Sequence, residues 1–236
     1  MTELDKGIRD AVRHFWLTRR TQATRRTDDR DRGARGAVTG SKQMDGFIRL
    51  IRRLLIEAKV PEVSIGIDKR IELPGWFRAE KKWDLVVVHD GELLAALEFK
   101  SQIGHSFGNN FNNRAEEALG GATDIWAAYR EGAFKPSARP FLGYLMLLED
   151  CERSRAPVKV IEPHFSVFPE FVGVSCRDRY AILIGKLLRE RLYDGACLLL
   201  SSASCAESGD YTEPQPELTF TKFVVPLLAR VASIHP

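Results

Sequence analysis

The sequence predicts one α/β domain in which helices cover a mixed β-sheet on both faces. Segments with helical periodicity alternate along the chain with shorter segments that have strand character. Several of these strand segments are almost entirely apolar, as is typical of strands buried on both faces. The chain of 236 residues is also long enough to bury a sizeable core without disulfides or a structural metal.

The first 42 residues are predicted to form an N-terminal helix and a basic arm, separate from a main domain over residues 43–236. Ile8, Val12, Phe15 and Trp16 recur at helical spacing, which predicts an amphipathic helix over residues 3–20 that docks on the core or on a partner chain. Residues 21–42 contain hardly any large apolar residue, so we expect a linker or arm.

Basic residues are concentrated in this arm. Residues 1–36 hold ten Lys and Arg against six Asp and Glu, although the net charge of the whole chain is only +3. Seven arginines crowd the second half of this stretch, namely Arg19, Arg20, Arg25, Arg26, Arg30, Arg32 and Arg35. Such a segment can follow phosphates. A solvated linker is the alternative, because Asp28, Asp29 and Asp31 offset part of the charge.

The remaining elements follow in chain order. An apolar stripe predicts a helix over residues 44–59, and the hairpin "WDLVVVHDGELLAALEFKSQ" comes next. Asn113 and Glu116 resemble a helix cap with its acidic partner, which predicts a helix over residues 114–131. The later elements expected are a buried strand over 141–149, a helix over 177–192, a strand over 196–201 and a mostly helical segment over 221–234.

The hairpin carries three charged residues among its hydrophobic ones. Glu98 and Lys100 are two residues apart in a strand and therefore project from the same face. A strict two-residue turn at Asp90-Gly91 would leave Asp84 facing away from Glu98. One slipped residue restores a common face, so we expect either a three-residue connection with Gly91 in the left-handed conformation or a bulge near Trp83 and Asp84.

Two carboxylates beside a lysine at a strand end are suited to phosphodiester cleavage. The carboxylate oxygens would bind Mg²⁺, which lowers the pKa of water and stabilises the pentacovalent phosphate, while Lys100 orients the attacking water. The alternative is a solvent-facing ion pair of Glu98 and Lys100 on an edge strand. Burying three charges without a metal or a partner would be costly, which favours the site.

Two long segments of the chain are "LPGWFRAEKKWDLVVV" and "LAALEFKSQIGHSFGNNFNNRAEEALGGATDIWAAYREGAF", and three later blocks are "FLGYLMLLED", "EPHFSVFPEF" and "RERLYDGA". Together they closely resemble the type II restriction endonucleases of the XhoI family. The resemblance covers most of residues 44–225. It implies a restriction-endonuclease-like core of the PD-(D/E)xK superfamily and a homodimer that cuts both strands of CTCGAG with Mg²⁺, leaving 5′ overhangs.

The resemblance also assigns site residues. Asp84, Glu98 and Lys100 correspond to the catalytic set, with Asp84 and Glu98 as metal ligands. Trp83 stands where the superfamily pattern has proline. Many enzymes of the superfamily add an acidic residue from the preceding helix, for which Glu57 is the candidate here, although a solvated helix surface explains a glutamate equally well.

The segment from Ser101 to Arg114 is nearly all polar or small, and the substrate is expected to pass there. Asn, Gln and Arg side chains can read base edges. The expected DNA contacts in this loop are Gln102, Asn109, Asn112, Asn113 and Arg114, although for Asn113 the role of helix cap is favoured over DNA contact. Arg78, Lys81 and Lys82 are expected to contact phosphates, whereas His105 is not included in the catalytic set.

Alternative functions are a structure-selective DNA repair nuclease on the same core and a catalytically inactive DNA-binding module. The chain lacks the Asn-Pro-Pro-aromatic motif of a methyltransferase, so a separate methyltransferase is expected to protect the same site in the host. No apolar stretch approaches the roughly 20 residues that span a bilayer. We therefore expect a soluble cytoplasmic protein of a bacterial or archaeal cell with no membrane partner. Candidates for its dimer interface are the N-terminal helix and the apolar C-terminal segment, although docking on their own core is the more common fate of such segments.

Overall fold

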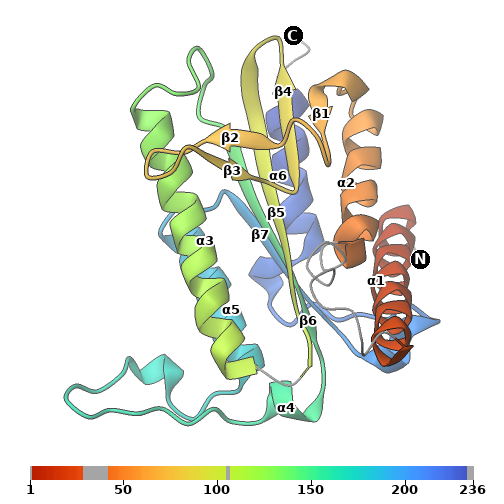
Figure 1. Ribbon diagram of the computed structural model, residues 1–236, viewed down its shortest axis with the longest axis vertical. Coiled ribbons are helices and arrows are strands. Elements are labelled where there is room, and N and C mark those ends of the chain that lie inside the picture. Colours follow the sequence, from red (N-terminus) through yellow and green to blue (C-terminus); the bar gives the residue numbers. More distant parts are fainter. Residues whose placement is uncertain (1, 29–41, 105–106, 233–236) are drawn as a thin grey trace.

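The structure, a computed structural model, describes residues 2–28, 42–104 and 107–232. Its centre is a five-stranded sheet in the order β1-β4-β5-β6-β7 (Figure 1). The strands are β1 (Ile65–Gly66), β4 (Leu85–His89), β5 (Glu92–Gln102), β6 (Phe141–Glu149) and β7 (Gly195–Ser201). Strand β4 pairs antiparallel with both of its neighbours, β1 and β5, and β5, β6 and β7 are parallel. The predicted mixed sheet is confirmed.

Helices cover both faces of this sheet. The helices are α1 (Glu3–Asp28), α2 (Asp45–Glu57), α3 (Phe107–Arg130), α4 (Glu152–Arg155), α5 (Cys176–Arg189) and α6 (Phe220–Ala232). One apolar cluster joins α1, α2 and α6 to the sheet, and a second joins α3 and α5 to the opposite face. A short hairpin, β2 (Glu72–Pro74) and β3 (Glu80–Lys82), lies over the face that carries α3.

The N-terminal helix is longer than predicted, because α1 continues from residue 20 to Asp28. No Gly or Pro follows Gly7 until Gly33, so nothing in the chain stops the helix at residue 20. The apolar face of α1 packs against the core of the domain. Phe15 is fully buried there, and Trp16 Nε1 donates to Ser201 Oγ at 3.0 Å. Arg30, Arg32 and Arg35 lie outside the described residues.

The start of α3 is also a correction. Asn113 does not cap this helix, because α3 begins six residues earlier, at Phe107. Phe107 is buried, and Phe111 packs edge-on against Tyr180 of α5 at 5.2 Å between ring centres. These two aromatics extend the buried stripe by two turns and outweigh the weak helix propensity of glycine and asparagine. The expected polar loop after β5 is therefore mostly helix.

The C-terminal half agrees closely with expectation. β6 has the predicted bounds, β7 starts one residue early, and α5 begins at Cys176 behind a capping box formed by Ser175 and Asp178. The apolar face of α6 is buried on the sheet through Phe220, Phe223 and Leu227. Across the described part of the chain, no helix has both the length and the apolar character needed to cross a membrane.

Candidate active site

The catalytic geometry begins with the register between β4 and β5. Leu85 pairs with Leu97 and Val87 with Ala95, but Val88 pairs with Leu93, so one extra residue, Leu94, bulges from β5. Leu94 and Ala95 consequently both face the cluster formed with α1, α2 and α6. The predicted one-residue slip is present, but it lies at Leu94. Gly91 has the expected left-handed conformation, whereas the expected three-residue connection is wrong.

The turn itself contains only two residues. His89 pairs with Glu92, and Asp90 and Gly91 have φ angles of 48° and 81°, as a tight hairpin turn requires. Because the slip lies at Leu94, Leu85 pairs with Leu97, and continuing this register by one residue sets Asp84 opposite Glu98. The Asp84 amide donates to Leu97 O at 3.1 Å, which holds this residue against β5. Directly opposed residues on one face have Cβ atoms about 5 Å apart. The two carboxylates therefore share one face of the sheet, the face that α3 covers.

Asp84 is held by the neighbouring strand. Its Oδ2 accepts a hydrogen bond from the Phe99 amide at 2.7 Å. Burial raises the pKa of the Asp84 carboxyl, because the charged form loses hydration, although the Phe99 amide and Lys100 partly offset this. Among the described residues no side chain or amide bonds to Oδ1, so this oxygen remains available to a ligand.

Glu98 is only 3% exposed and lies between two lysines. Its Oε1 is 2.7 Å from Lys100 Nζ, and its Oε2 is 3.1 Å from Lys81 Nζ. Burial opposes the charged form of Glu98, but attraction to Lys100 and Lys81 outweighs it and lowers the pKa of this carboxyl. For Lys100 burial is likewise opposed by Glu98, and the pKa of the ammonium is raised. Glu98 and Lys100 are therefore both charged at neutral pH.

Helix α3 approaches the catalytic strand closely at Gly121. A Cβ atom at this position would lie 3.1 Å from Lys81 Cε and 3.5 Å from Glu98 Oε2. One turn earlier, Glu117 lies 3.6 Å from Lys100 Nζ and forms an ion pair with Arg114. The sequence analysis did not assign Glu117 to the site, although its spacing from Arg114 is that of a helical ion pair.

A cavity of about 210 Å³ opens beside the candidate catalytic residues and is lined by Gln43, Met44, Asp84, Phe99, Lys100, Ser101 and Arg114. Gln43 is a site residue that the sequence analysis missed. Its Nε2 donates to Ser101 Oγ at 2.7 Å, and its Oε1 accepts from Arg19 of α1 at 3.2 Å. No local pattern marks Gln43, because its partners are 24 and 58 residues away in the chain.

Glu57 is not brought to this site. It is 61% exposed at the last position of α2, with Arg53 Nε 3.7 Å from its Oε1. The cavity borders the beginning of α2, at Gln43 and Met44, and a helix of 13 residues is about 20 Å long. Glu57 therefore belongs to a solvated helix surface, the alternative to a role as metal ligand.

The other predicted residues are distributed as follows. Gln102 is 3% exposed, and its amide donates to Ile103 O, so its side chain offers no group to a ligand. Asn112 and Asn113 are exposed on α3, as part of a helix and not of a loop, whereas the side chain of Asn109 lies outside the described atoms. Arg78 pairs with Asp124 of α3 at 2.8 Å, and the exposed Lys82 pairs with Glu72 at 3.3 Å.

The donor set at Asp84 and Glu98 fits a Mg²⁺ ion. Mg²⁺ prefers carboxylate oxygens and is usually held by one or two of them, together with water and substrate phosphate. Two carboxylates on one face meet that requirement. Within residues 2–28, 42–104 and 107–232, no group of three or more His, Cys, Asp or Glu side chains is arranged so that it could hold a metal ion.

Comparison with known proteins identifies the family of this chain. The family model for restriction endonuclease XhoI matches residues 23–213. The chain belongs to the XhoI family of restriction endonucleases. The resemblance found in the sequence is thereby confirmed, and the protein is a type II restriction enzyme, a site-specific deoxyribonuclease.

Three relatives define its place in the family. Type II restriction enzyme BstVI of Geobacillus stearothermophilus is 51% identical over 209 residues, covering 86% of this chain and 93% of the relative. Type II restriction enzyme XhoI of Xanthomonas vasicola is 42% identical, covering 80% and 77%. Type II restriction enzyme AbrI of Azospirillum brasilense is 44% identical, covering 70% and 75%. No solved structure matches this chain.

Proposed function

We propose that this enzyme hydrolyses both strands of double-stranded DNA at the palindrome CTCGAG in a Mg²⁺-dependent reaction that leaves 5′ overhangs. Asp84, Glu98 and Lys100 are its catalytic residues. The observation that carries this proposal is the position of Asp84 against β5, where its Oδ2 accepts from the Phe99 amide at 2.7 Å, next to Glu98, whose Oε1 is 2.7 Å from Lys100 Nζ. The sequence of the palindrome and the overhang come from the family resemblance.

Each catalytic residue has a role that follows from its surroundings. Asp84 and Glu98 hold the ion through carboxylate oxygens, and the Phe99 amide fixes the orientation of Asp84. Lys100 stays protonated because Glu98 raises its pKa, so it can orient the attacking water through an N–H donor. When bound, Mg²⁺ supplies Lewis-acid stabilisation of the charge on the phosphate and makes a water more acidic. The apolar β-sheet behind the site strengthens these electrostatic interactions.

DNA contacts are proposed on two elements. Asn109, Asn112, Asn113 and Arg114 belong to the first two turns of α3, next to the catalytic strand, and are candidates for base recognition. Arg78, Lys81 and Lys82 lie on the β2–β3 hairpin and are candidates for phosphate contact. Gln102 is left out of this set because its side chain is buried.

A palindromic substrate calls for two-fold symmetry, because identical active sites must address opposite strands. We therefore propose that the enzyme acts as a homodimer. A separate cognate methyltransferase that acts on the same palindrome would protect host DNA, in the cytoplasm of a bacterial or archaeal cell. Together the two proteins would form a restriction-modification system.

The deciding experiment incubates purified protein with a plasmid that carries one CTCGAG site, in Mg²⁺, in Ca²⁺ and with chelator, and then sequences the ends. We expect one cut at that site in Mg²⁺ alone. Cutting at other sequences would overturn the assigned palindrome, and cutting directed at junctions or nicks would indicate a repair nuclease. Binding without any cleavage would indicate an inactive DNA-binding protein.

A further inference from the structure

The tip of the β2–β3 hairpin exposes two large aromatic side chains. Trp76 is 55% exposed and Phe77 is 71% exposed, next to each other between Pro74 and Glu80. The other three tryptophans of the chain, Trp16, Trp83 and Trp126, are all buried. Adjacent exposed aromatics of this size are uncommon on a surface without a partner.

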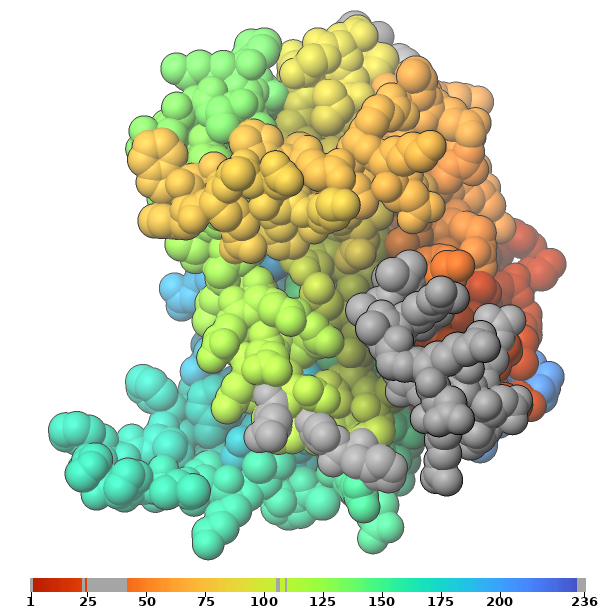
Figure 2. Space-filling model, in the orientation of Figure 1, coloured from red at the N-terminus to blue at the C-terminus, as the bar shows by residue number. Residues whose placement is uncertain are grey.

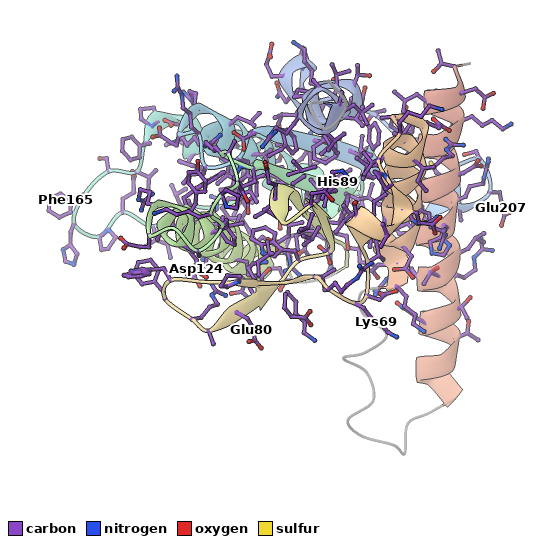
Figure 3. The ribbon with its side chains drawn as sticks, turned by 90° about the horizontal axis from the view of Figure 1, so that it is seen from above. Lys69, Glu80, His89, Asp124, Phe165 and Glu207 are labelled. Carbon is purple, nitrogen blue, oxygen red and sulfur yellow. The ribbon has the colours of Figure 1, made fainter. Side chains whose placement is uncertain are left out.

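A buried carboxylate fixes this tip in place. Asp124 of α3 is 2% exposed, and its Oδ1 accepts hydrogen bonds from the amides of Trp76 and Phe77, both at 2.8 Å. Its Oδ2 lies 2.8 Å from Arg78 Nε. Gly75 permits this approach, because a Cβ atom there would collide with Oδ2 of Asp124. These contacts hold the tip on α3, and Figure 3 shows Asp124 beside the hairpin.

The backbone contacts with Asp124 determine where the aromatic rings point. Both amides are turned inward to Asp124, and the side chains of Trp76 and Phe77 remain exposed. Burying a carboxylate is costly unless its hydrogen bonds are satisfied, and here three donors satisfy it. Two rings held on a fixed backbone lose little conformational entropy when they bind a partner.

The surroundings of the tip favour DNA as that partner. The hairpin carries Arg78 directly after the aromatics, and Lys81 and Lys82 on its return strand. Lys81 also contacts catalytic Glu98 at 3.1 Å, so the hairpin that bears the tip reaches the active site. In Figure 2 the hairpin, in orange, spreads over the front surface of the molecule. Aromatic rings beside cations suit the sugars and bases of a polyanion.

We propose that Trp76 and Phe77 are DNA-contacting residues that pack against sugars and base edges in the groove next to the scissile phosphate. This inference rests on the proposed function, since it presupposes a duplex bound at Glu98. Arg78 binds the adjacent phosphate through the guanidinium nitrogens that Asp124 does not engage. The tip thus adds apolar contact area to the polar recognition proposed for α3.

The test uses the intrinsic fluorescence of the full-length protein, because Trp76 is the exposed tryptophan. A duplex with one CTCGAG site is added in Ca²⁺, and binding is followed by anisotropy of a dye on the DNA. Quenching by acrylamide, a neutral molecule that DNA does not repel, reports exposure of the indole. We expect quenching to fall on binding and this fall to be absent in Trp76→Phe.

A second arm measures affinity by the same anisotropy. Phe77→Ala is expected to weaken binding roughly tenfold, as truncation of an aromatic anchor does. The matched control is Phe165→Ala, in which an 88% exposed phenylalanine is removed from a loop that projects away from the hairpin (Figure 3). The control is expected to bind within about twofold of the parent protein, as exposed surface substitutions usually do.

The outcomes separate this inference from the proposed function. Binding and specific cleavage with unchanged quenching of Trp76 would overturn the inference and leave the proposed function intact. Absence of any binding to the duplex would overturn both. Shielding of Trp76 that increases with protein concentration in the absence of DNA would also overturn it, because the tip would then contact a second copy of the chain.

Discussion

Two buried carboxylates, Glu98 on β5 and Asp124 on α3, are both almost free of solvent contact, yet their partners differ in kind. Asp124 accepts from two backbone amides and one guanidinium. Within the described part of the chain, the polar contacts of the Glu98 carboxylate are with the two lysine ammonium groups, at 2.7 and 3.1 Å. Backbone amides cannot leave without moving the chain, whereas lysine side chains are flexible and can be drawn to another anion.

Because of these partners, Asp124 fixes the position of the backbone, whereas Glu98 can exchange its partners. Asp124 positions the hairpin tip, and its hydrogen bonds persist for as long as the loop is folded. Glu98 keeps its charge by ion pairing with two flexible lysine side chains, which can move and leave its oxygens open to another cation. The following experiments disturb one carboxylate at a time, from the largest expected effect to the smallest.

Glu98→Ala is expected to lower cleavage by at least about a thousandfold, because a metal-ion contribution of several kcal/mol corresponds to that factor. DNA binding in Ca²⁺ is expected to remain largely intact. Cleavage of a one-site plasmid and anisotropy on a labelled duplex measure the two quantities. Glu98→Gln, which retains the shape of the side chain, controls for folding. Retained cleavage in both variants would exclude Glu98 as a catalytic residue.

Asp124→Ala is expected to lower the free energy of unfolding by about 2 kcal/mol, because it removes the carboxylate that accepts from two amides and pairs with Arg78. Urea denaturation measures this loss. Asp124→Asn is the graded control, because its carbonyl oxygen can still accept from Trp76 and Phe77 while its amide group opposes Arg78. An alanine variant as stable as the parent would mean that the tip does not depend on Asp124.

Lys81→Met is expected to reduce the cleavage rate roughly tenfold and to lower the slope of log affinity against log salt by about one. The matched control is Lys82→Met, on the next residue of the hairpin, which pairs with Glu72 and not with Glu98. The control is expected to change the salt slope alone. If the two variants cut at the same rate, contact with Glu98 has no part in catalysis.

Asp84→Asn is expected to stabilise the metal-free fold at neutral pH. Burial raises the pKa of Asp84 in the folded state, so the folded protein holds more protons between the unfolded and folded pKa values. Stability therefore falls as the pH rises through that window and stays reduced above it. Asparagine removes this charge and still accepts from the Phe99 amide.

The measurement is the urea midpoint as a function of pH, with chelator present. The advantage of Asp84→Asn should vanish below the ordinary pKa range of aspartate. Glu98 has the opposite sign: its lowered pKa contributes stability above the unfolded value, which is lost as the pH falls through the folded one, so Glu98→Gln should be less stable at neutral pH. An asparagine variant less stable than the parent at pH 7 would contradict the direction given for Asp84.

Gly121→Ala is expected to change stability by less than about 1 kcal/mol, because the gain in helix propensity is offset by contact with Lys81. Cleavage should fall a few-fold as Lys81 is displaced. Gly185→Ala in α5 is the control, since a Cβ atom there meets nothing within 4 Å and only the propensity changes. Thermal melts and cleavage rates distinguish the two. Equal activity in both variants would show that Lys81 tolerates the methyl group.

Much of the fold was predictable because it depends on neighbours in the chain. The strand at Phe141–Glu149 and the helix behind Ser175 follow from apolar runs and a capping pattern within a few residues. The start of α3 was not predictable in this way, because Phe107 and Phe111 are helical only when α5 supplies a surface for them. The length of α1 was not predictable from composition, because the polar residues after residue 20 continue the helix without an apolar stripe of their own.

Local spacing was enough to predict the proposed catalytic set, because Glu98 and Lys100 share a face of any strand and Asp84 directly precedes the neighbouring strand β4. The tertiary structure alone decided the bulge at Leu94, which turns Asp84 toward Glu98. It also decided the contacts of Lys81 with Glu98, of Asp124 with the hairpin tip and of Gln43 with Ser101. Spacing along one element follows from backbone geometry, whereas contacts between distant segments depend on how the elements pack.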